Sequence, residues 1–382
     1  MANYDLIIVG AGIFGCTVAE QAARDKKHVL VLDKREHIGG NAYAEFDAET
    51  GIEVHKYGAH LFHTSDEAVW QYVNKFTAFN SYVHKVYTVH KGEVFPMPIN
   101  LGTINQFFHA NYSPNEARAK IHELAGESAN VIPKNLDEQG TKLIGRPLYE
   151  AFIMNYTKKQ WQTDTKDLSP DIIKRLPVRY NYDNRYFNDK YEGLPLHGYK
   201  KLFENMLQSD YIDVKLGVDF FDASQSINKD AVKGNVPVVY TGPIDRYFDY
   251  LEGDLSWRTV DFKTEKLDVA DFQGTSVVNY ADSDTPFTRI IEYKHFAQER
   301  EYKAEKTIID REFSRFATRA DDPYYPIGTP EDALKLVRYQ KKAAHEKSTY
   351  FGGRLGQYKY FDMHHVFSQA LTAYNTAIKE LK

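Results

Sequence analysis

The chain has 382 residues, 42% of them hydrophobic, so two or three domains with a sizeable core are expected. Its formal net charge of −5 gives no electrostatic reason to expect nucleic acid or an anionic membrane as a partner, so any anionic ligand must be held by local arginines. A single cysteine, Cys16, excludes an intrachain disulfide and fits a reducing cytoplasm. No apolar run of about 18 residues is present, so we expect neither a membrane span nor a signal peptide and predict a cytoplasmic protein.

The most informative segment is residues 4–40, where an apolar run leads into Gly10, Gly12 and Gly15. A helical stretch and a second apolar run follow, ending on Asp33. Gly10 permits a tight turn, Gly12 lets the backbone approach a pyrophosphate, and Gly15 lets the helix pack close to the strand. The helix N-terminus favours phosphate charge, and Asp33 is placed to accept hydrogen bonds from a ribose hydroxyl. This order predicts a dinucleotide-binding βαβ unit.

A second glycine pair, Gly39-Gly40, follows shortly after Asp33, between Lys34 and Asn41. It resembles the FAD-binding Rossmann families of the glutathione reductase and amine oxidase type. In those families the extra glycines let the chain pass close to the rest of an extended FAD. The alternative is another tight turn. We therefore expect FAD as the cofactor.

The next elements are taken in chain order. Residues 83–98 alternate in polarity around Lys91-Gly92 and predict a β-hairpin. A capping box with proline at the first helical position begins a helix at Ser113. Helical periodicity resumes over 141–160, and the polar residues 162–171 predict a surface loop that can act as a lid. Strands are predicted over 212–221 and 236–241, and strand-like segments over 259–265, 276–282, 287–296 and 306–316. After these, the sequence predicts a helix from 329 to about 345, a glycine-rich turn at 351–356 and a last helix over 363–381.

Strands that resemble those of the βαβ unit thus occur at both ends of the chain, with helices and an antiparallel sheet between them. We predict an α/β fold, in which a Rossmann-like FAD-binding domain carries a helical insertion and an antiparallel β-sheet domain. The predicted boundaries are 1–80, 197–246 and 323–382 for the discontinuous FAD-binding domain, 97–170 for the helical domain with a mobile lid near 162–175, and 81–96, 171–196 and 247–322 for the sheet domain.

Six dispersed segments resemble the bacterial UDP-galactopyranose mutase family over nearly the full length of the chain. They are GAHLFHT (58–64), FPMPINLGTINQFF (95–108), NYTKKQWQ (155–162), RLPVRYNYDNRYFND (175–189), DPYYPI (322–327) and GGRLGQYKYFDM (352–363). The resemblance implies an isomerase that interconverts UDP-galactopyranose and UDP-galactofuranose. It implies that reduced FAD acts through N5 as a nucleophile with no net redox, and that UDP is a product-like ligand. It also implies a homodimer that supplies galactofuranose for cell-surface glycans.

The resemblance assigns two arginines and three tyrosines to the UDP diphosphate. The arginines are Arg175 and Arg289, whose planar guanidinium groups suit phosphate. The tyrosines are Tyr186, Tyr325 and Tyr360, and because Tyr324 is adjacent to Tyr325, a shift of one place remains an alternative. We expect the lid over 162–175 to have few apolar anchors and to carry Arg175 inward.

Phe152, Tyr156 and Trp161 match the uridine site of the family, and the first two lie four residues apart on one helix face. The resemblance places His63 beside the flavin, on the face away from the sugar. Arg175, Arg289 and His63 are the residues expected to act in catalysis. No metal is expected, because no cysteine or carboxylate cluster accompanies the histidines.

The remaining assignments concern the cofactor and the polar residues near it. The expected cofactor-binding residues are Gly10, Gly12, Phe14, Gly15, Asp33, Lys34, Gly40, Asn41, His60, Arg354, Tyr360, Asp362 and Met363. Asp362 and Glu312 are interpreted as members of a polar network. Asn279 is assigned to substrate binding, and Arg258 matches a family position with a weaker local motif. His84 departs from an asparagine found in some family members.

Three alternatives remain open from the sequence. One is a flavin oxidoreductase of the amine oxidase type, which shares the Rossmann core. Another is a non-catalytic flavoprotein that binds a nucleotide sugar. The third is a related flavoprotein of different specificity.

Overall fold

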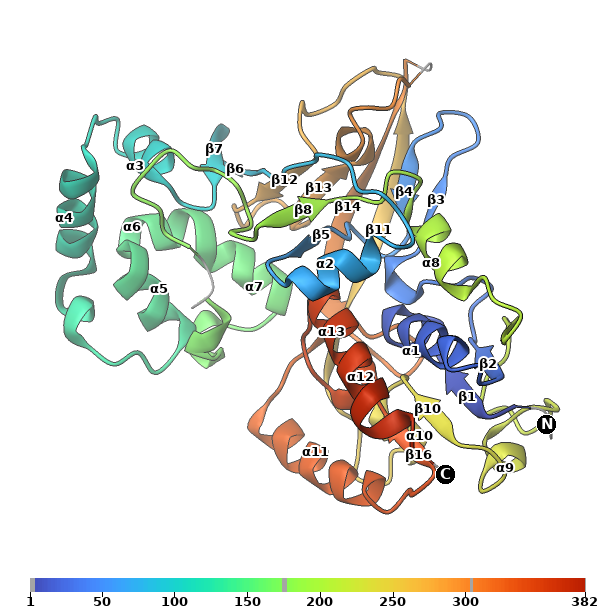
Figure 1. The fold of residues 1–382 in the computed structure, drawn as a ribbon. Coiled ribbons are helices and arrows are strands. Elements are labelled where there is room, and N and C mark those ends of the chain that lie inside the picture. The colour runs from blue at the N-terminus through green and yellow to red at the C-terminus, as the bar shows by residue number, and fades with distance from the viewer. Residues whose placement is uncertain (1–3, 174–176, 303–304, 382) are drawn as a thin grey trace.

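The structure is a computed structural model and describes residues 4–173, 177–302 and 305–381. It contains a five-stranded parallel sheet in the order β16-β10-β1-β2-β9 (Figure 1). The strands are β1 (Leu6–Val9), β2 (Val29–Leu32), β9 (Ile212–Lys215), β10 (Val238–Tyr240) and β16 (Thr349–Phe351). The predicted βαβ unit is therefore confirmed, and strands from distant parts of the chain complete its sheet.

Alternating side chains of this sheet face two different layers. Ile8 and Val31 join the core beneath α1, α8 and α13, whereas Ile7 and Leu30 join a second cluster with Phe220. Both faces are thus buried, which is why its strands are continuously apolar. The helices that accompany the sheet are α1 (Ile13–Arg24), α2 (Glu67–Val73), α8 (Tyr199–Leu207), α9 (Lys229–Val232), α10 (Ile244–Tyr247), α11 (Pro330–Ala343), α12 (Gly353–Gln357) and α13 (Met363–Ala373).

The second large sheet has seven strands in the order β15-β11-β14-β13-β12-β6-β7. The strands are β6 (Val86–His90), β7 (Glu93–Met97), β11 (Trp257–Leu267), β12 (Val277–Tyr280), β13 (Arg289–Glu292), β14 (Thr307–Phe316) and β15 (Tyr325–Pro326). Its neighbours pair antiparallel except β12 and β6, which are parallel. The expectation of an antiparallel sheet is confirmed apart from this one pair.

Two short strand pairs lie outside these sheets. β3 (Ala44–Phe46) pairs with β4 (Glu53–His55). β5 (Phe62–Thr64) pairs with β8 (Tyr191–Gly193), which joins the GAHLFHT segment to a part of the chain about 130 residues later. This second pair brings the GAHLFHT segment next to the residues that directly follow the family-like segment 175–189.

A group of helices lies to one side of both sheets (Figure 1). These are α3 (Leu101–Phe107), α4 (Pro114–Ala125), α5 (Leu136–Ile144), α6 (Arg146–Leu148) and α7 (Asn155–Trp161). The capping box predicted at Ser113 is confirmed, because its side chain and that of Glu116 bond reciprocally to the backbone. A π-helical turn over Tyr149–Met154 joins α6 to α7.

Several element boundaries differ from the sequence prediction. The hairpin at 83–98 is confirmed as β6 and β7, with Lys91 and Gly92 both at positive φ. The strand predicted over 287–296 ends at Glu292, and a 3₁₀ turn follows. β15 pairs with β11 although its residues were assigned to the nucleotide domain, so the domain boundaries stay a prediction. Within the described residues, every helix is too short or too polar to span a bilayer.

Candidate functional site

A cavity of about 1260 Å³ extends from the glycine turn after β1 to the second sheet and α7. Its volume exceeds the roughly 300–1,000 Å³ typical of a small-ligand pocket. The lining includes the cofactor residues expected from the sequence, namely Gly10, Gly12, Phe14, Asp33, Lys34, Gly40, Asn41, His60, Arg354, Tyr360, Asp362 and Met363. Gly15 lies behind this surface, in helix α1. The space therefore suits a dinucleotide together with a second ligand.

The two glycine turns contact each other at one end of this cavity. Gly10 has φ of +111°, and a Cβ there would lie 2.0 Å from Thr241 Oγ1. A Cβ on Gly40, at φ +57°, would lie 3.0 Å from the Cα of Gly12. Asp33 accepts hydrogen bonds from the amides of Ala11 at 2.8 Å and of Arg35 at 2.9 Å. The acid thus holds the glycine turn in place. Close approach to the Gly12 backbone explains Gly40, whereas a Cβ on Gly39, at φ +92°, would lie 2.7 Å from the Phe203 ring.

Arg289 lies at the start of β13, opposite Glu312 of β14. Its Nε donates to Glu312 Oε2 at 2.7 Å, and within the described part of the chain this leaves the two Nη groups of the fork for another acceptor. Burial opposes the charge on Arg289, but the adjacent Glu312 carboxylate raises the pKa of Arg289 well above its usual range. Asn279 is the register partner of Arg289 on β12 and also lines the cavity. The arginine is therefore a fixed, permanently charged donor.

Four tyrosines line the cavity, and three of them, Tyr156, Tyr186 and Tyr325, interact electrostatically with Arg289. The fourth is Tyr360. Burial raises the pKa of each, so each hydroxyl keeps its proton at neutral pH. The rings of Tyr325 and Tyr360 stack with their centroids 5.7 Å apart, whereas Tyr324 is only 6% exposed and lies near Phe262. This geometry favours Tyr325 over Tyr324 as the tyrosine expected to contact the diphosphate.

The three aromatic residues assigned to the uridine also line the cavity. Phe152 is 3% exposed and packs edge-to-face against Phe95 and Phe107, so much of its role is structural. Tyr156 and Trp161 come from α7 and are less enclosed by other rings. The bracketing of a base by Phe152 and Tyr156 stays a prediction.

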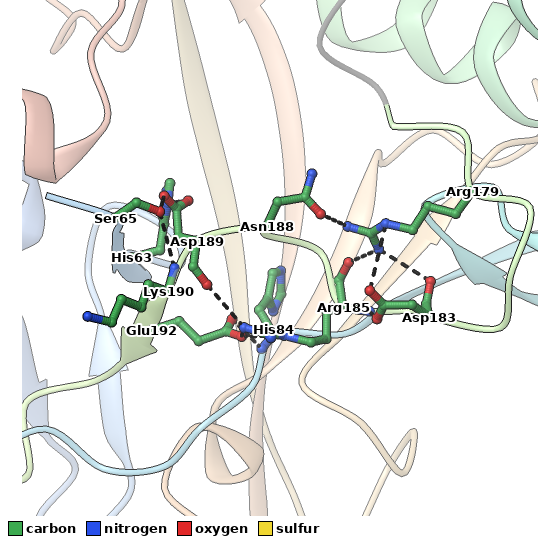
Figure 2. A network of polar contacts seen from close by, with 10 residues as sticks. All are labelled: His63, Ser65, His84, Arg179, Asp183, Arg185, Asn188, Asp189, Lys190 and Glu192. Atoms are coloured by element: carbon green, nitrogen blue, oxygen red, sulfur yellow. Dashed lines mark hydrogen bonds and ion pairs between the residues drawn. The ribbon is translucent and has the colours of Figure 1, made fainter.

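Both histidines of the GAHLFHT segment line the cavity, and each is anchored. His63 Nδ1 lies 2.7 Å from Asp189 Oδ2 (Figure 2). The amide of His60 donates to His55 Nδ1 at 3.0 Å, and the carbonyl of His60 accepts from Tyr199 at 2.9 Å. Burial lowers the pKa of His60 to about 4, so its ring is neutral at physiological pH.

Some residues assigned from the sequence lie elsewhere or outside the described residues. Arg258 is absent from the cavity lining of the described residues; its Nε donates to Gln160 O at 3.2 Å, at the end of α7. Arg175 lies outside the described residues. Leu168 and Ile173 are 8% and 2% exposed in the main core, so the expectation of few apolar anchors in the 162–175 segment is wrong for its described part.

Sequence reasoning missed three residues near the site. Phe187 and Asp189 contact His63, and the signal for them was that they lie with Tyr186 in the family-like segment 175–189. His84 was noted only as a departure; it lines the cavity, and burial lowers its pKa to about 3. The premise behind expecting no metal is also incomplete, because ligand atoms of His63, Asp362 and His364 lie within 4.8 Å of one another. Because Nδ1 of His63 bonds Asp189, only its Nε2 is left for such a cluster, and the absence of a metal stays a prediction.

Comparisons with known proteins identify the family of this chain. The family model described as UDP-galactopyranose mutase matches residues 151–360, and that described as an NAD(P)-binding Rossmann-like domain matches residues 8–76. The chain is 41% identical over 371 residues to a probable UDP-galactopyranose mutase of Klebsiella pneumoniae, covering 97% of this chain and 94% of the relative. It is 38% identical over 383 residues to the dTDP-fucopyranose mutase of Escherichia coli, covering 99% of each.

Two further comparisons bear on family and fold. A UDP-galactopyranose mutase of Mycoplasma genitalium is 30% identical, covering 94% of this chain and 91% of the relative. A crystal structure of reduced UDP-galactopyranose mutase superimposes with a TM-score of 0.76 at 13% identity, covering 99% of this chain and 94% of that one, and shows the shared fold. The dinucleotide-binding domain and the family together imply a flavin cofactor. On full-length identity to several relatives, this chain belongs to the UDP-galactopyranose mutase family of isomerases.

Proposed function

We propose that this enzyme interconverts UDP-galactopyranose and UDP-galactofuranose with FAD as its cofactor, active when the flavin is reduced. The observation that carries the proposal is one continuous cavity that joins the glycine turn to Arg289 and its tyrosines. Its support from relatives is the 41% identity over 97% of the chain to a protein described as a probable UDP-galactopyranose mutase.

The residues at the glycine end fit FAD. Gly10, Gly12 and Gly40 leave no side chain between the backbone and a pyrophosphate, and α1 begins at Ile13 with free amides and a positive dipole end. Asp33 lines this part of the cavity and has further lone pairs for a ribose hydroxyl. When bound here and reduced, the flavin would supply an electron-rich N5 as the nucleophile for the anomeric carbon.

The chain's own residues bind and orient the nucleotide sugar. The Nη groups of Arg289 match the two oxygens of a phosphate, and the neutral hydroxyls of Tyr186 and Tyr325 donate to the same group without adding charge. These contacts strengthen as UDP leaves and its negative charge grows, so they favour the transition state over the ground state. We propose Arg175 as a second cation and Tyr156 and Trp161 as the uridine contacts.

A second candidate substrate is dTDP-fucopyranose. It is favoured by the 38% identity that extends over 99% of both chains. The two substrates differ in the nucleobase and in the sugar, so a direct comparison of turnover decides between them. We also propose, from the family resemblance and the single cysteine, a cytoplasmic homodimer that supplies galactofuranose to cell-surface glycans.

The test is product analysis by HPLC with UDP-galactofuranose and dTDP-fucofuranose, each with and without dithionite. We expect a yellow protein that releases FAD on denaturation and converts UDP-galactofuranose only after reduction. Equal turnover by air-oxidised enzyme without reductant would overturn the nucleophilic role of the flavin. A kcat/KM higher for dTDP-fucofuranose would reassign the substrate and leave the flavin chemistry intact.

A further inference from the structure

We propose that Asp189 is a positioning residue that fixes the orientation of His63 and holds a proton on Nδ1, so that Nε2 is the nitrogen left to accept a hydrogen bond. The inference deepens the proposed function, because His63 lines the cavity assigned to the flavin. Its first step is the geometry of one carboxylate. Asp189 Oδ2 lies 2.7 Å from His63 Nδ1, and Oδ1 accepts from Ser65 Oγ at 2.8 Å (Figure 2).

The carboxylate determines which nitrogen of His63 carries the proton. Partial burial alone would raise the pKa of Asp189, but the hydrogen bonds from His63 and Ser65 lower it below the usual range, so the group is ionised at neutral pH. An ionised carboxylate only accepts hydrogen bonds, so Nδ1 must donate. Among the described residues, none bonds to Nε2 of His63. A neutral ring then has its lone pair on Nε2.

The ring of His63 is also held by neighbours on its face and edge. Phe187 stacks on it with ring centroids 3.7 Å apart and an interplanar angle of 12°. His364 meets it edge-on at 4.8 Å and 69°. The side chain of His63 is only 9% exposed. With the face covered and Nδ1 bonded, rotation about the side-chain torsions would cost both contacts at once.

Asp189 itself belongs to a segment that is tied down repeatedly, residues 179–192, which we call the strap. Figure 2 shows this segment crossing near His63 and His84. Arg185 forms an ion pair with Glu192 at 2.6 Å and donates to the carbonyl of Asp189 at 3.3 Å. The amide of Lys190 donates to Ser65 Oγ at 3.1 Å, so Ser65 contacts both the backbone and the carboxylate of the strap.

The other end of the strap is fixed near the substrate side of the cavity. Arg179 bonds Asn188 and the carbonyl of Arg185. The amide of Tyr186 donates to the carbonyl of His84 at 2.8 Å, and the amide of His84 lies 3.2 Å from Glu192 Oε2. One rigid segment therefore carries Tyr186, which we assign to the diphosphate, and Asp189, which orients His63. Asp189 therefore links the segment that carries Tyr186 to the orientation of His63, which lines the cavity assigned to the flavin.

The decisive experiment reads the tautomer directly. Long-range ¹H–¹⁵N correlation spectra of holoenzyme labelled with ¹⁵N-histidine separate the two neutral tautomers, and a His63→Gln variant assigns the His63 signals among the 14 histidines. In the wild-type protein we expect Nδ1–H with an unprotonated Nε2. A wild-type His63 with Nε2–H would overturn the proposal, whatever the variants do. This measurement requires no turnover, so it stands or fails independently of the proposed function.

Asp189→Asn removes the charge at nearly constant shape and lets an amide N–H face Nδ1 instead. We expect the Nε2–H tautomer to become populated, the flavin midpoint potential to shift, and kcat to fall about 10-fold or more with KM for the UDP-sugar unchanged. The matched control is Asp183→Asn on the same strap, where the carboxylate accepts from the amide of Arg185 at 3.0 Å and does not contact His63. Identical spectra for the Asp189→Asn variant and wild type, or equal effects of the two variants, would refute the positioning role.

Discussion

Lys159 offers a sharp test of how α7 is joined to the second sheet. Its ammonium donates to four backbone carbonyls of one turn, those of Tyr280 at 2.6 Å, Asp282 at 2.8 Å, Thr285 at 2.9 Å and Phe287 at 3.2 Å. Burial lowers the pKa of Lys159 to about 8, so the group is still mostly charged at pH 7. The turn leads directly into β13 and Arg289. We predict that Lys159→Met loosens this turn and weakens UDP binding.

The size of the expected effect follows from the number of protons that the Lys159 ammonium can donate. An ammonium has three, so at most three of the four carbonyls receive a good hydrogen bond at one time. A hydrogen bond to a charged group contributes about 1.5–3 kcal/mol net, and three that share one partly exposed charge are less than additive. We take about 3 kcal/mol in total, which corresponds to roughly 150-fold lower protection of the turn amides against exchange.

The assay is hydrogen exchange measured by mass spectrometry on peptides covering residues 278–290. The matched control is Lys158→Met, the adjacent lysine of the same helix. Its ammonium pairs with Asp164 at 2.8 Å between side chains that are 38% and 46% exposed, a contact worth about 0–1 kcal/mol. Unchanged exchange in the Lys159→Met protein, or equal loss of protection in both variants, would show that the ammonium does not hold the turn.

Three further predictions concern the site and its stability. Arg289→Lys should lose about 10²-fold or more in kcat while FAD stays bound, because a point charge cannot replace the planar fork; near-normal kcat would remove Arg289 from the diphosphate site. Trp161→Ala should weaken UDP binding by roughly 1–3 kcal/mol in calorimetry with the flavin spectrum unchanged, and wild-type affinity would place the uridine elsewhere. Burial lowers the pKa of His55 to about 3 from 6.5, so the stability it contributes is present above pH 6.5 and lost as the pH falls toward 3. His55→Asn removes the titrating ring and keeps an acceptor for the His60 amide. Melting temperatures measured between pH 7 and pH 4.5 should therefore fall less steeply for this variant than for the wild-type protein. An unchanged slope would show that His55 does not contribute to the pH dependence of stability.

The features that sequence predicted correctly are those set by neighbouring residues. The glycine turn after β1 requires a glycine at Gly10, because the backbone there has φ of +111° and any Cβ would meet Thr241. The capping box at Ser113 satisfies helix amides within one turn. The hairpin of β6 and β7 closes through two residues at positive φ. Each of these depends on a few consecutive positions, so a single sequence contains the information.

The features that sequence missed are contacts between distant segments. His63 and Asp189 are 126 positions apart, and neither residue type shows which partner it will meet. The parallel pairing of β12 with β6 depends on how two remote segments are brought together, not on the apolar pattern of either strand. Leu168 and Ile173 lie in a polar stretch, yet both are buried in the main core because α5 packs beside them. The polar composition of this segment therefore led to the wrong prediction that it has few apolar anchors.

The end of the cavity that we propose for the diphosphate combines Arg289, which is already paired with Glu312, and several neutral donors. Glu312 neutralises much of the charge of Arg289 while it aims the free edge of the guanidinium. Tyr156, Tyr186 and Tyr325 add hydroxyl protons that burial keeps in place. Donors of this kind recognise phosphate oxygens by direction and give a moderate attraction, which suits the reaction proposed above, in which the nucleotide leaves the sugar and returns to it within one turnover. An uncompensated cluster of cations would hold UDP more tightly before and after bond cleavage alike, and such uniform binding does not raise kcat.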